Sequence, residues 1–292
     1  DLIALLAERV DEQPARAVRI LEAVSISGEP LERSVLLSLP GTGEVSRLVI
    51  ANLGRARLLR LLKKEGKVSI EVYHDRIRDA VLSRLDPPEI RDWHLELGEA
   101  LEGHPTANPE ALFRHFAGAD RPEKAADYAV RAAENATASL AFLHAAELYG
   151  RALELRDWSR AERGRLTELR GEAFANAGHG GRAAAEFLAA GALEGGDLRL
   201  RRRAWEQFFR SGRVEEGVEA LRATLREGHT AFPDSRAAAI VGLLSGVLRL
   251  CLRNGRYVPR SERDVPPQAL NRLDDYISAA RGLIMVDPLC AG

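Results

Sequence analysis

The residue composition and the apolar pattern of the sequence change at Val72-Tyr73-His74-Asp75-Arg76-Ile77-Arg78-Asp79-Ala80-Val81. Before this stretch lie short apolar patterns and a charged turn, and after it comes a long region rich in alanine and leucine. Strand-forming residues gather at residues 58–73, whereas the helix formers Ala, Leu, Glu and Arg dominate elsewhere. We therefore expect a mainly α-helical chain with one small β element.

Upstream of this stretch the apolar spacing predicts three helices and a hairpin. Pro14 suits the first position of a helix, and the segment around Gly28 and Pro30 ends it. The remaining helices are expected near residues 35–39 and 44–57, followed by extended runs at 58–62 and 68–73. Residues 63–67 form a charged turn with Gly66 where a positive φ is needed. Three helices followed by a hairpin is the order of a winged helix.

Many winged helices bind DNA through their third helix, so this alternative must be weighed. The third helix offers Arg47, Arg55 and Arg57, and the turn of the hairpin offers three lysines. However, the apolar run 48–50 leaves little polar surface for reading base edges, and a charged hairpin turn is usually just solvated. The net charge of −1 also gives no general attraction to nucleic acid. The sequence therefore disfavours DNA binding.

His74 and Asp75 form the first candidate site. They lie where the second extended run gives way to a helix, and Asp75 suits the N-cap of that helix. A helix N-terminus beside an imidazole can receive a phosphate that another domain supplies. Alternatively, His74 packs at a corner and Asp75 only caps the helix. On residue types alone, the second interpretation is favoured.

The region downstream contains an internal repeat. Gly178 and Gly212 lie 34 residues apart, each at an expected turn between helices. The same offset aligns Glu172 with Glu206, Phe174 with Phe208, Ala183 with Gly217 and Phe187 with Leu221. Ala145, Tyr149 and Ala152 repeat the order small, large, small, which lets two helices pack closely. Residues 145–155 resemble the second helix of a tetratricopeptide repeat, and the resemblance covers about 122–227.

Such a helical solenoid usually binds a protein or peptide. Its strongest positive cluster contains Arg199, Arg202, Arg203 and Arg210, together with Arg201 and Arg213. The cluster is either the solvated face of one repeat helix, which is the favoured interpretation, or a binding surface for an acidic partner. We retain the first four of these arginines as candidate partner-binding residues.

Composition excludes several other classes of protein. No apolar run reaches the length of about 20 residues that a membrane span needs. The two cysteines, Cys251 and Cys290, are too few for a disulfide framework or a zinc site, so a cytoplasmic protein without a metal is expected. Gly41-Thr42-Gly43 lacks the following Gly-Lys-Ser/Thr of a phosphate-binding loop, and we find no catalytic constellation. The chain itself is therefore predicted not to be an enzyme.

Residues 15–101 resemble the winged-helix segment of bacterial STAND-type (AAA/NB-ARC-like) signal-transduction ATPases. The resemblance is strongest to those fused to serine/threonine kinases or to LuxR-type regulators. It implies that His74-Asp75 matches a His-Asp pair that contacts the β-phosphate of ADP, with Tyr73 where the motif more often has an apolar residue. It also implies an upstream ATPase domain that binds ADP or ATP, and ATPase or kinase activity in the parent protein rather than in this chain.

These observations predict a regulatory sensor and protein-interaction segment of a multidomain ATPase. Both ends look cut, because an apolar helix begins directly at Asp1 and Asp287-Pro288 looks like a new helix start. The alternatives are a structural tetratricopeptide scaffold and, less favoured, a DNA-binding regulator. The expected parts are the end of an upstream helix (1–13), a winged helix with coupling helices (14–105), helical repeats (106–254), an exposed loop (255–267) and a further solenoid helix (268–292).

Overall fold

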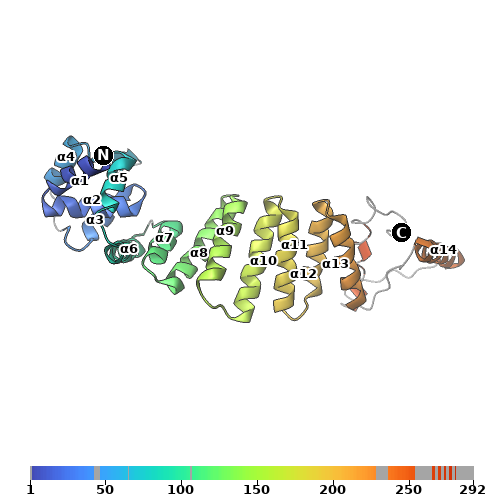
Figure 1. Ribbon diagram of the computed structural model, residues 1–292. Helices are drawn as coiled ribbons and strands as arrows, with labels where there is room; N and C mark the ends of the chain where they lie inside the picture. Colours follow the sequence, from blue (N-terminus) through green and yellow to red (C-terminus); the bar gives the residue numbers. More distant parts are fainter. Residues whose placement is uncertain are drawn as a thin grey trace. The chain divides into compact units, whose positions relative to one another are not determined.

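The computed structural model describes residues 2–42, 47–64, 66–105, 107–227 and 236–253, and a few positions between 265 and 280. The described chain is mainly helical, as its composition predicts (Figure 1). It divides into two compact units, residues 1–132 with 154–156 and residues 133–153 with 157–292. Each unit is described below by itself.

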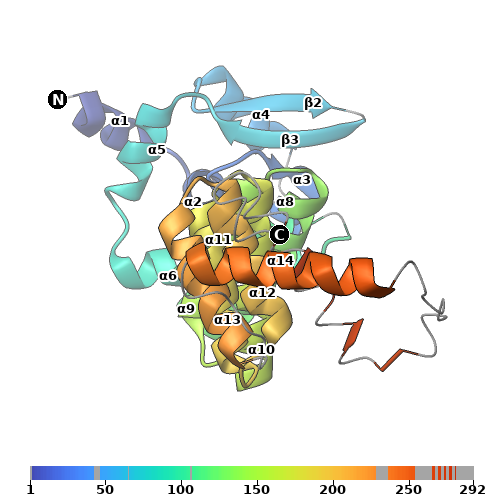
Figure 2. The same cartoon turned by 90° about the vertical axis from the view of Figure 1, so that its right-hand side faces the viewer.

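The first unit begins with helices and a small antiparallel sheet. The helices are α1 (Leu2–Asp11), α2 (Ala15–Ser27), α3 (Arg33–Ser38) and α4 (Arg47–Arg55), and the strands are β1 (Leu31–Glu32), β2 (Leu59–Lys64) and β3 (Lys67–Val72). The strand order is β1-β3-β2, and Leu61 of β2 lies opposite Ile70 of β3. Figure 2 shows β2 and β3 as a long hairpin. The predicted order of three helices and a hairpin is present, and β1 was not predicted.

Apolar side chains from all of these elements form one core in the first unit. Val10 of α1, Leu21 of α2, Leu36 of α3 and Leu53 of α4 are fully buried in it, as is Ile70 of β3. Because Val10 lies in this core, α1 packs as part of the unit. The core also holds α5 (Asp75–Leu82), which packs against α1 and α2.

Two further helices, α6 (Pro87–Glu102) and α7 (Pro109–Gly118), follow in the first unit. The start of α6 is fixed by a capping box in which Asp86 and Glu89 exchange hydrogen bonds of 2.8 Å. The two helices pack together, and His94 of α6 lies 3.0 Å from His115 of α7, measured between the Nδ1 atoms. His115 is fully buried.

The repeat region consists of helices connected by short turns, and the last four of them pack each on the next. They are α8 (Pro122–Ala138), α9 (Phe142–Leu155), α10 (Arg160–Asn176), α11 (Gly180–Leu193), α12 (Leu198–Arg210) and α13 (Val214–Glu227). The small and large residues Ala183, Phe187 and Ala190 are fully buried, as their spacing predicts. Gly178 and Gly212 adopt φ values of 80° and 75°, which explains glycine at both turns.

Downstream of the repeats, α14 spans Arg236–Arg253, where the sequence predicts an apolar helix. The loop predicted at 255–267 and the helix predicted at 268–292 lie almost entirely outside the described residues. Among the described helices, none combines the length and the apolar character that crossing a bilayer requires.

Candidate functional site

His74 occupies the junction between β3 and α5. The amide of Tyr73 still donates to the carbonyl of Leu58 at 3.0 Å, which extends the hairpin to the residue before His74. His74 has extended backbone angles (φ −153°, ψ 145°), and its Nδ1 accepts a hydrogen bond from the amide of Arg76 at 3.2 Å. His74 is therefore the N-cap of α5.

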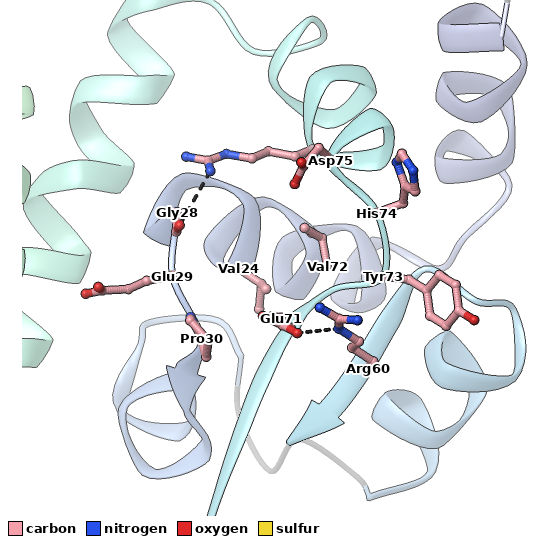
Figure 3. A pocket seen from close by; sticks show the side chains of 11 residues that line it. Val24, Gly28, Glu29, Pro30, Arg60, Glu71, Val72, Tyr73, His74 and Asp75 are labelled. Atoms are coloured by element: carbon pink, nitrogen blue, oxygen red, sulfur yellow. Dashed lines mark hydrogen bonds and ion pairs between the residues drawn. The ribbon is translucent and has the colours of Figure 1, made fainter. Parts of the chain in front are cut away.

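Asp75 does not cap α5, which corrects the sequence prediction. It is the first residue of the helix, because His74 already supplies the acceptor for the free amide of Arg76. A carboxylate in the first turn still interacts favourably with the helix dipole. Figure 3 shows the Asp75 carboxylate on the side of Gly28, whereas the His74 ring points away from Arg60 and Glu71. The two side chains are adjacent in sequence but point in different directions.

A cavity of about 350 Å³ adjoins this junction (Figure 3). Its walls come from the end of α2, the turn at Gly28, the hairpin and the start of α5. Gly28 has φ +72°, and a Cβ atom there would come within 2.7 Å of Nη2 of Arg78. Glycine at this turn therefore leaves room for the guanidinium, whose Nη1 donates to the carbonyl of Gly28 at 3.5 Å.

The charges around the cavity largely balance one another. Arg60 forms an ion pair with Glu71 across the hairpin, and Glu29 forms one with Arg114 at 2.9 Å. Arg78 and the exposed Asp75 add one charge of each sign. An anion would therefore be held through individual hydrogen-bond donors rather than through a large positive field.

Two of the four predicted arginines on α12, Arg199 and Arg203, bind carboxylates of α10. Arg199 binds Glu168 through two hydrogen bonds of 2.6 and 3.1 Å. Arg203 binds Glu168 at 2.7 Å and Glu172 at 2.8 Å, and its guanidinium lies 4.2 Å from the ring centre of Phe187. The hydrogen bond from Arg199 lowers the pKa of Glu168, whose carboxylate therefore stays charged. These contacts link α10 to α12.

Arg210 is placed differently from Arg199 and Arg203. It lines a polar cleft of about 440 Å³ between α10 and α12, and the cleft also contains Glu172, Ala175, Asn176, Arg203, Glu206 and Gln207. Arg202 is half-buried on the same helix and is not among the residues that line the cleft. Asn176 and Gln207 were not predicted as site residues, although the 34-residue repeat that aligns Glu172 with Glu206 indicates that α10 and α12 contribute equivalent positions.

A Ser-His-Glu group in the first unit was also not predicted. Ser34 Oγ lies 3.1 Å from Nε2 of His104, and Glu32 Oε2 lies 3.6 Å from the same nitrogen. In a catalytic triad the carboxylate binds one imidazole nitrogen and the serine binds the other. Because both partners meet Nε2 here, this arrangement does not position His104 as a general base for Ser34.

The exposed side of α4 bears on the DNA-binding alternative. Leu48 is 61% exposed, and Asn52 and Arg55 follow it along the same side of the helix. Nη1 of Arg55 donates to Oδ1 of Asn52 at 3.0 Å, so these two polar side chains are engaged with each other. This side of α4 therefore offers an apolar residue and an internally bonded pair. Among the described residues, no group of three His, Cys, Asp or Glu side chains could hold a metal ion.

Comparisons with known proteins give one structural match. No family model matches the chain, and no curated protein matches it. Among solved structures, the chain is similar to a signal-transduction ATPase with numerous domains that carries a tetratricopeptide-repeat sensor, from Pyrococcus horikoshii, at 13% sequence identity and a TM-score of 0.33. The match covers 99% of this chain and 48% of that protein, so this chain spans about half of the length of the protein it matches.

Proposed function

We propose that this chain is the regulatory sensor and protein-interaction segment of a cytoplasmic multidomain signalling ATPase. The first unit is a winged helix that senses the nucleotide held by an upstream ATPase domain, and the tetratricopeptide-like repeats bind a protein or peptide. The chain itself catalyses no reaction and carries no cofactor or metal. ATPase activity, and any serine/threonine kinase activity, resides in other parts of the parent protein.

The orientation of His74 carries the nucleotide-sensing part of this proposal. Its Nδ1 accepts the amide proton of Arg76, so in the neutral imidazole the proton is on Nε2. The exposed ring therefore presents Nε2–H as a donor, already oriented by the start of α5. A phosphate oxygen is a fitting acceptor for such a donor, and the amides of the helix N-terminus add to the attraction. Asp75 contributes to the helix start rather than to the phosphate.

The switch that follows from this arrangement is a shift of population. Bound ADP would join the upstream domain to the first unit through His74 and favour a closed form of the parent protein. A partner on the repeats would favour release only if it binds the open form more tightly than the closed form. Within the repeats, Arg210 and the amides of Asn176 and Gln207 are the groups available for this partner, since Arg199 and Arg203 bind Glu168.

The experiment is a measurement of ADP affinity in the chain extended upstream to include the ATPase domain. His74→Ala should weaken ADP binding by about 1.5–3 kcal/mol, the contribution of a hydrogen bond to a charged group. His74→Asn should weaken it to a similar extent while keeping a good N-cap, which separates the loss of the donor from the loss of the helix start. His144→Ala, on the repeats, is the matched control and should leave the affinity unchanged.

Two outcomes would favour the alternatives. Unchanged ADP affinity in folded His74→Ala and His74→Asn variants would leave the first unit as a structural cap on a tetratricopeptide scaffold. Tight binding to duplex DNA that weakens steeply with salt would favour the DNA-binding regulator. The exposed Leu48 and the Asn52–Arg55 hydrogen bond on α4 make the second outcome the less expected one.

A further inference from the structure

Arg57 occupies a backbone position that normally takes glycine. It lies between the end of α4 and the start of β2 and has a φ of +55°. This left-handed conformation is unfavourable for residues with a side chain, and helices that end in this way usually have glycine there. Gly178 and Gly212 follow that rule at the turns of the repeats. An arginine at position 57 therefore needs a reason other than the shape of the turn.

The contacts of the turn do not supply that reason. The amide of Arg57 donates to the carbonyl of Gly54 at 3.0 Å, and the amide of Leu58 donates to that of Leu53 at 2.9 Å. Leu58 is fully buried and fixes the chain that follows. Arg57 itself is exposed, and its guanidinium forms no hydrogen bond or ion pair with the residues that the structure describes. Its charge therefore adds nothing visible to the fold.

The hairpin places Arg57 beside His74. The amide of Tyr73 donates to the carbonyl of Leu58 at 3.0 Å, which continues the pairing of β2 with β3 by one residue. Arg57 directly precedes this last pair, and His74 directly follows it. Because the Cα atoms of paired residues in an antiparallel ladder are about 4.5–5.5 Å apart, the side chain of Arg57 is long enough to reach the space beside the imidazole.

A second guanidinium lies next to Arg57. Arg9 of α1 donates through Nη2 to the carbonyl of Ala56 at 2.9 Å, and it forms no ion pair with a described carboxylate. The carboxylate of Asp75 is on the side of Gly28 (Figure 3). Two guanidiniums that lie close together without a carboxylate between them repel each other, and a bound anion would relieve this repulsion.

The phosphate site proposed at His74 requires such a cation. The neutral imidazole offers one hydrogen bond through Nε2–H, whereas a terminal phosphate carries a charge of about −1.5 to −2 at pH 7. An arginine supplies both a permanent positive charge and two parallel donors that match the oxygens of a phosphate. The exposed guanidinium of Arg57 meets this need, while that of Arg9 is already bound to a carbonyl.

We propose that Arg57 is a second phosphate-binding residue of the site at His74. Its guanidinium binds the same terminal phosphate of ADP that accepts the hydrogen bond from Nε2–H of His74. The left-handed turn holds the arginine at the end of the hairpin, where a glycine would serve the fold alone. This inference rests on the nucleotide-sensing function proposed above, and it assigns Arg57 to a nucleotide phosphate rather than to DNA.

The experiment compares ADP affinity with thermal stability in the chain extended upstream to include the ATPase domain. Arg57→Gly should unfold at the same or a higher temperature than the wild type, because glycine adopts a φ of +55° without strain. The same variant should bind ADP about 10- to 100-fold more weakly, the loss expected for a hydrogen bond to a charged group. A purely structural role for Arg57 would not combine these two results.

Arg57→Gln and Arg55→Gln form a matched pair of variants. Both remove one positive charge, two residues apart, but Arg55 binds Oδ1 of Asn52. Only Arg57→Gln should weaken ADP binding. In the 292-residue chain, inorganic pyrophosphate should shift the amide NMR signals of Arg57 and His74 together, and Arg57→Gly should reduce the shift at His74.

The outcomes separate this inference from the proposed function. Unchanged ADP affinity in Arg57→Gly, together with a loss in His74→Ala, would overturn the role of Arg57 and leave nucleotide sensing in place. Unchanged affinity in both variants would remove both proposals. Equal weakening by Arg57→Gln and Arg55→Gln would show general attraction instead of a contact. Lost duplex DNA binding with unchanged ADP affinity in Arg57→Gly would assign the arginine to DNA phosphates.

Discussion

His115 illustrates how a single buried side chain sets a pH dependence. Burial, together with the neighbouring His94 and Arg114, lowers the pKa of His115 to about 3, against an ordinary value of about 6.5. The Nε2 atom of His115 is buried and has no hydrogen-bond partner. A proton on this ring is therefore strongly disfavoured in the folded protein and accepted readily in the unfolded chain.

Lowering the pH should consequently destabilise the first unit. The stability that neutral His115 contributes is complete above pH 6.5, because His115 is then unprotonated in both the folded and the unfolded protein. This stability is lost as the pH falls from 6.5 toward 3. The free energy of unfolding should fall by up to about 1.4 kcal/mol per pH unit in this range. Urea unfolding at pH 7, 6, 5 and 4 measures it, with His115→Leu as the comparison. A variant with the same pH slope as the wild type would contradict this assignment.

At the scale of elements, the packing of α11 on α12 depends on a residue without a side chain. A Cβ atom at Gly180 would lie 2.8 Å from the backbone oxygen of Gln207, which cannot move without shifting α12. Gly180→Ala should therefore destabilise the second unit by about 1–3 kcal/mol. Thermal or urea unfolding of the purified variant checks this value.

Gly54→Ala provides the control for that substitution. Gly54 lies in α4, and the nearest atom to its Cβ position is 3.9 Å away. The added methyl group meets no obstacle, and it reduces the freedom of the unfolded chain. We expect Gly54→Ala to stabilise the first unit by about 0.4–1 kcal/mol. Destabilisation by both alanines would mean that close helix approach is not the cause of the effect at Gly180.

The link between α10 and α12 includes one carboxylate, that of Glu168, which two guanidiniums share. Glu168→Gln should destabilise the second unit by about 1–2 kcal/mol, a figure reduced from that of a buried ion pair because the arginines are partly exposed. A double-mutant cycle of Glu168→Gln with Arg203→Gln checks this prediction, because it measures the coupling energy between the two side chains. Strictly additive effects of the two substitutions would show that the ion pair contributes nothing.

At the scale of the whole molecule, the two compact units should unfold separately. Each has its own set of internal contacts, and such chains often depart from two-state behaviour. Calorimetry should show two transitions. His115→Leu should shift the transition of the first unit, and Gly180→Ala should shift that of the second. One transition that both substitutions move equally would contradict this prediction.

The sequence predicts the helices and the hairpin well, because apolar periodicity and turn glycines depend on local positions. The positive φ values of Gly178 and Gly212 are the clearest case. β1 was missed because two residues are too few to show any alternation. The N-cap was assigned to Asp75 instead of His74 because both side chains can accept an amide proton, and only the backbone angles decide between them.

The candidate sites were harder to predict than the fold. The arginines of α12 are visible in the sequence as positive charge, but their pairing with Glu168 depends on how α12 packs against α10. The cleft with Asn176 and Gln207 arises from the same packing and has no local signature. In contrast, the position of His74 at the end of the hairpin followed directly from the order of elements.

The sharing of Glu168 between Arg199 and Arg203 also bears on how fast a partner can bind. Because these charges neutralise one another across short distances, the surface between α10 and α12 exerts only a weak field on a molecule approaching from solution. Association there should proceed near the unsteered rate of about 10⁵–10⁶ M⁻¹ s⁻¹ and vary little with ionic strength. The lifetime of the complex, rather than the frequency of encounters, would then distinguish one partner from another.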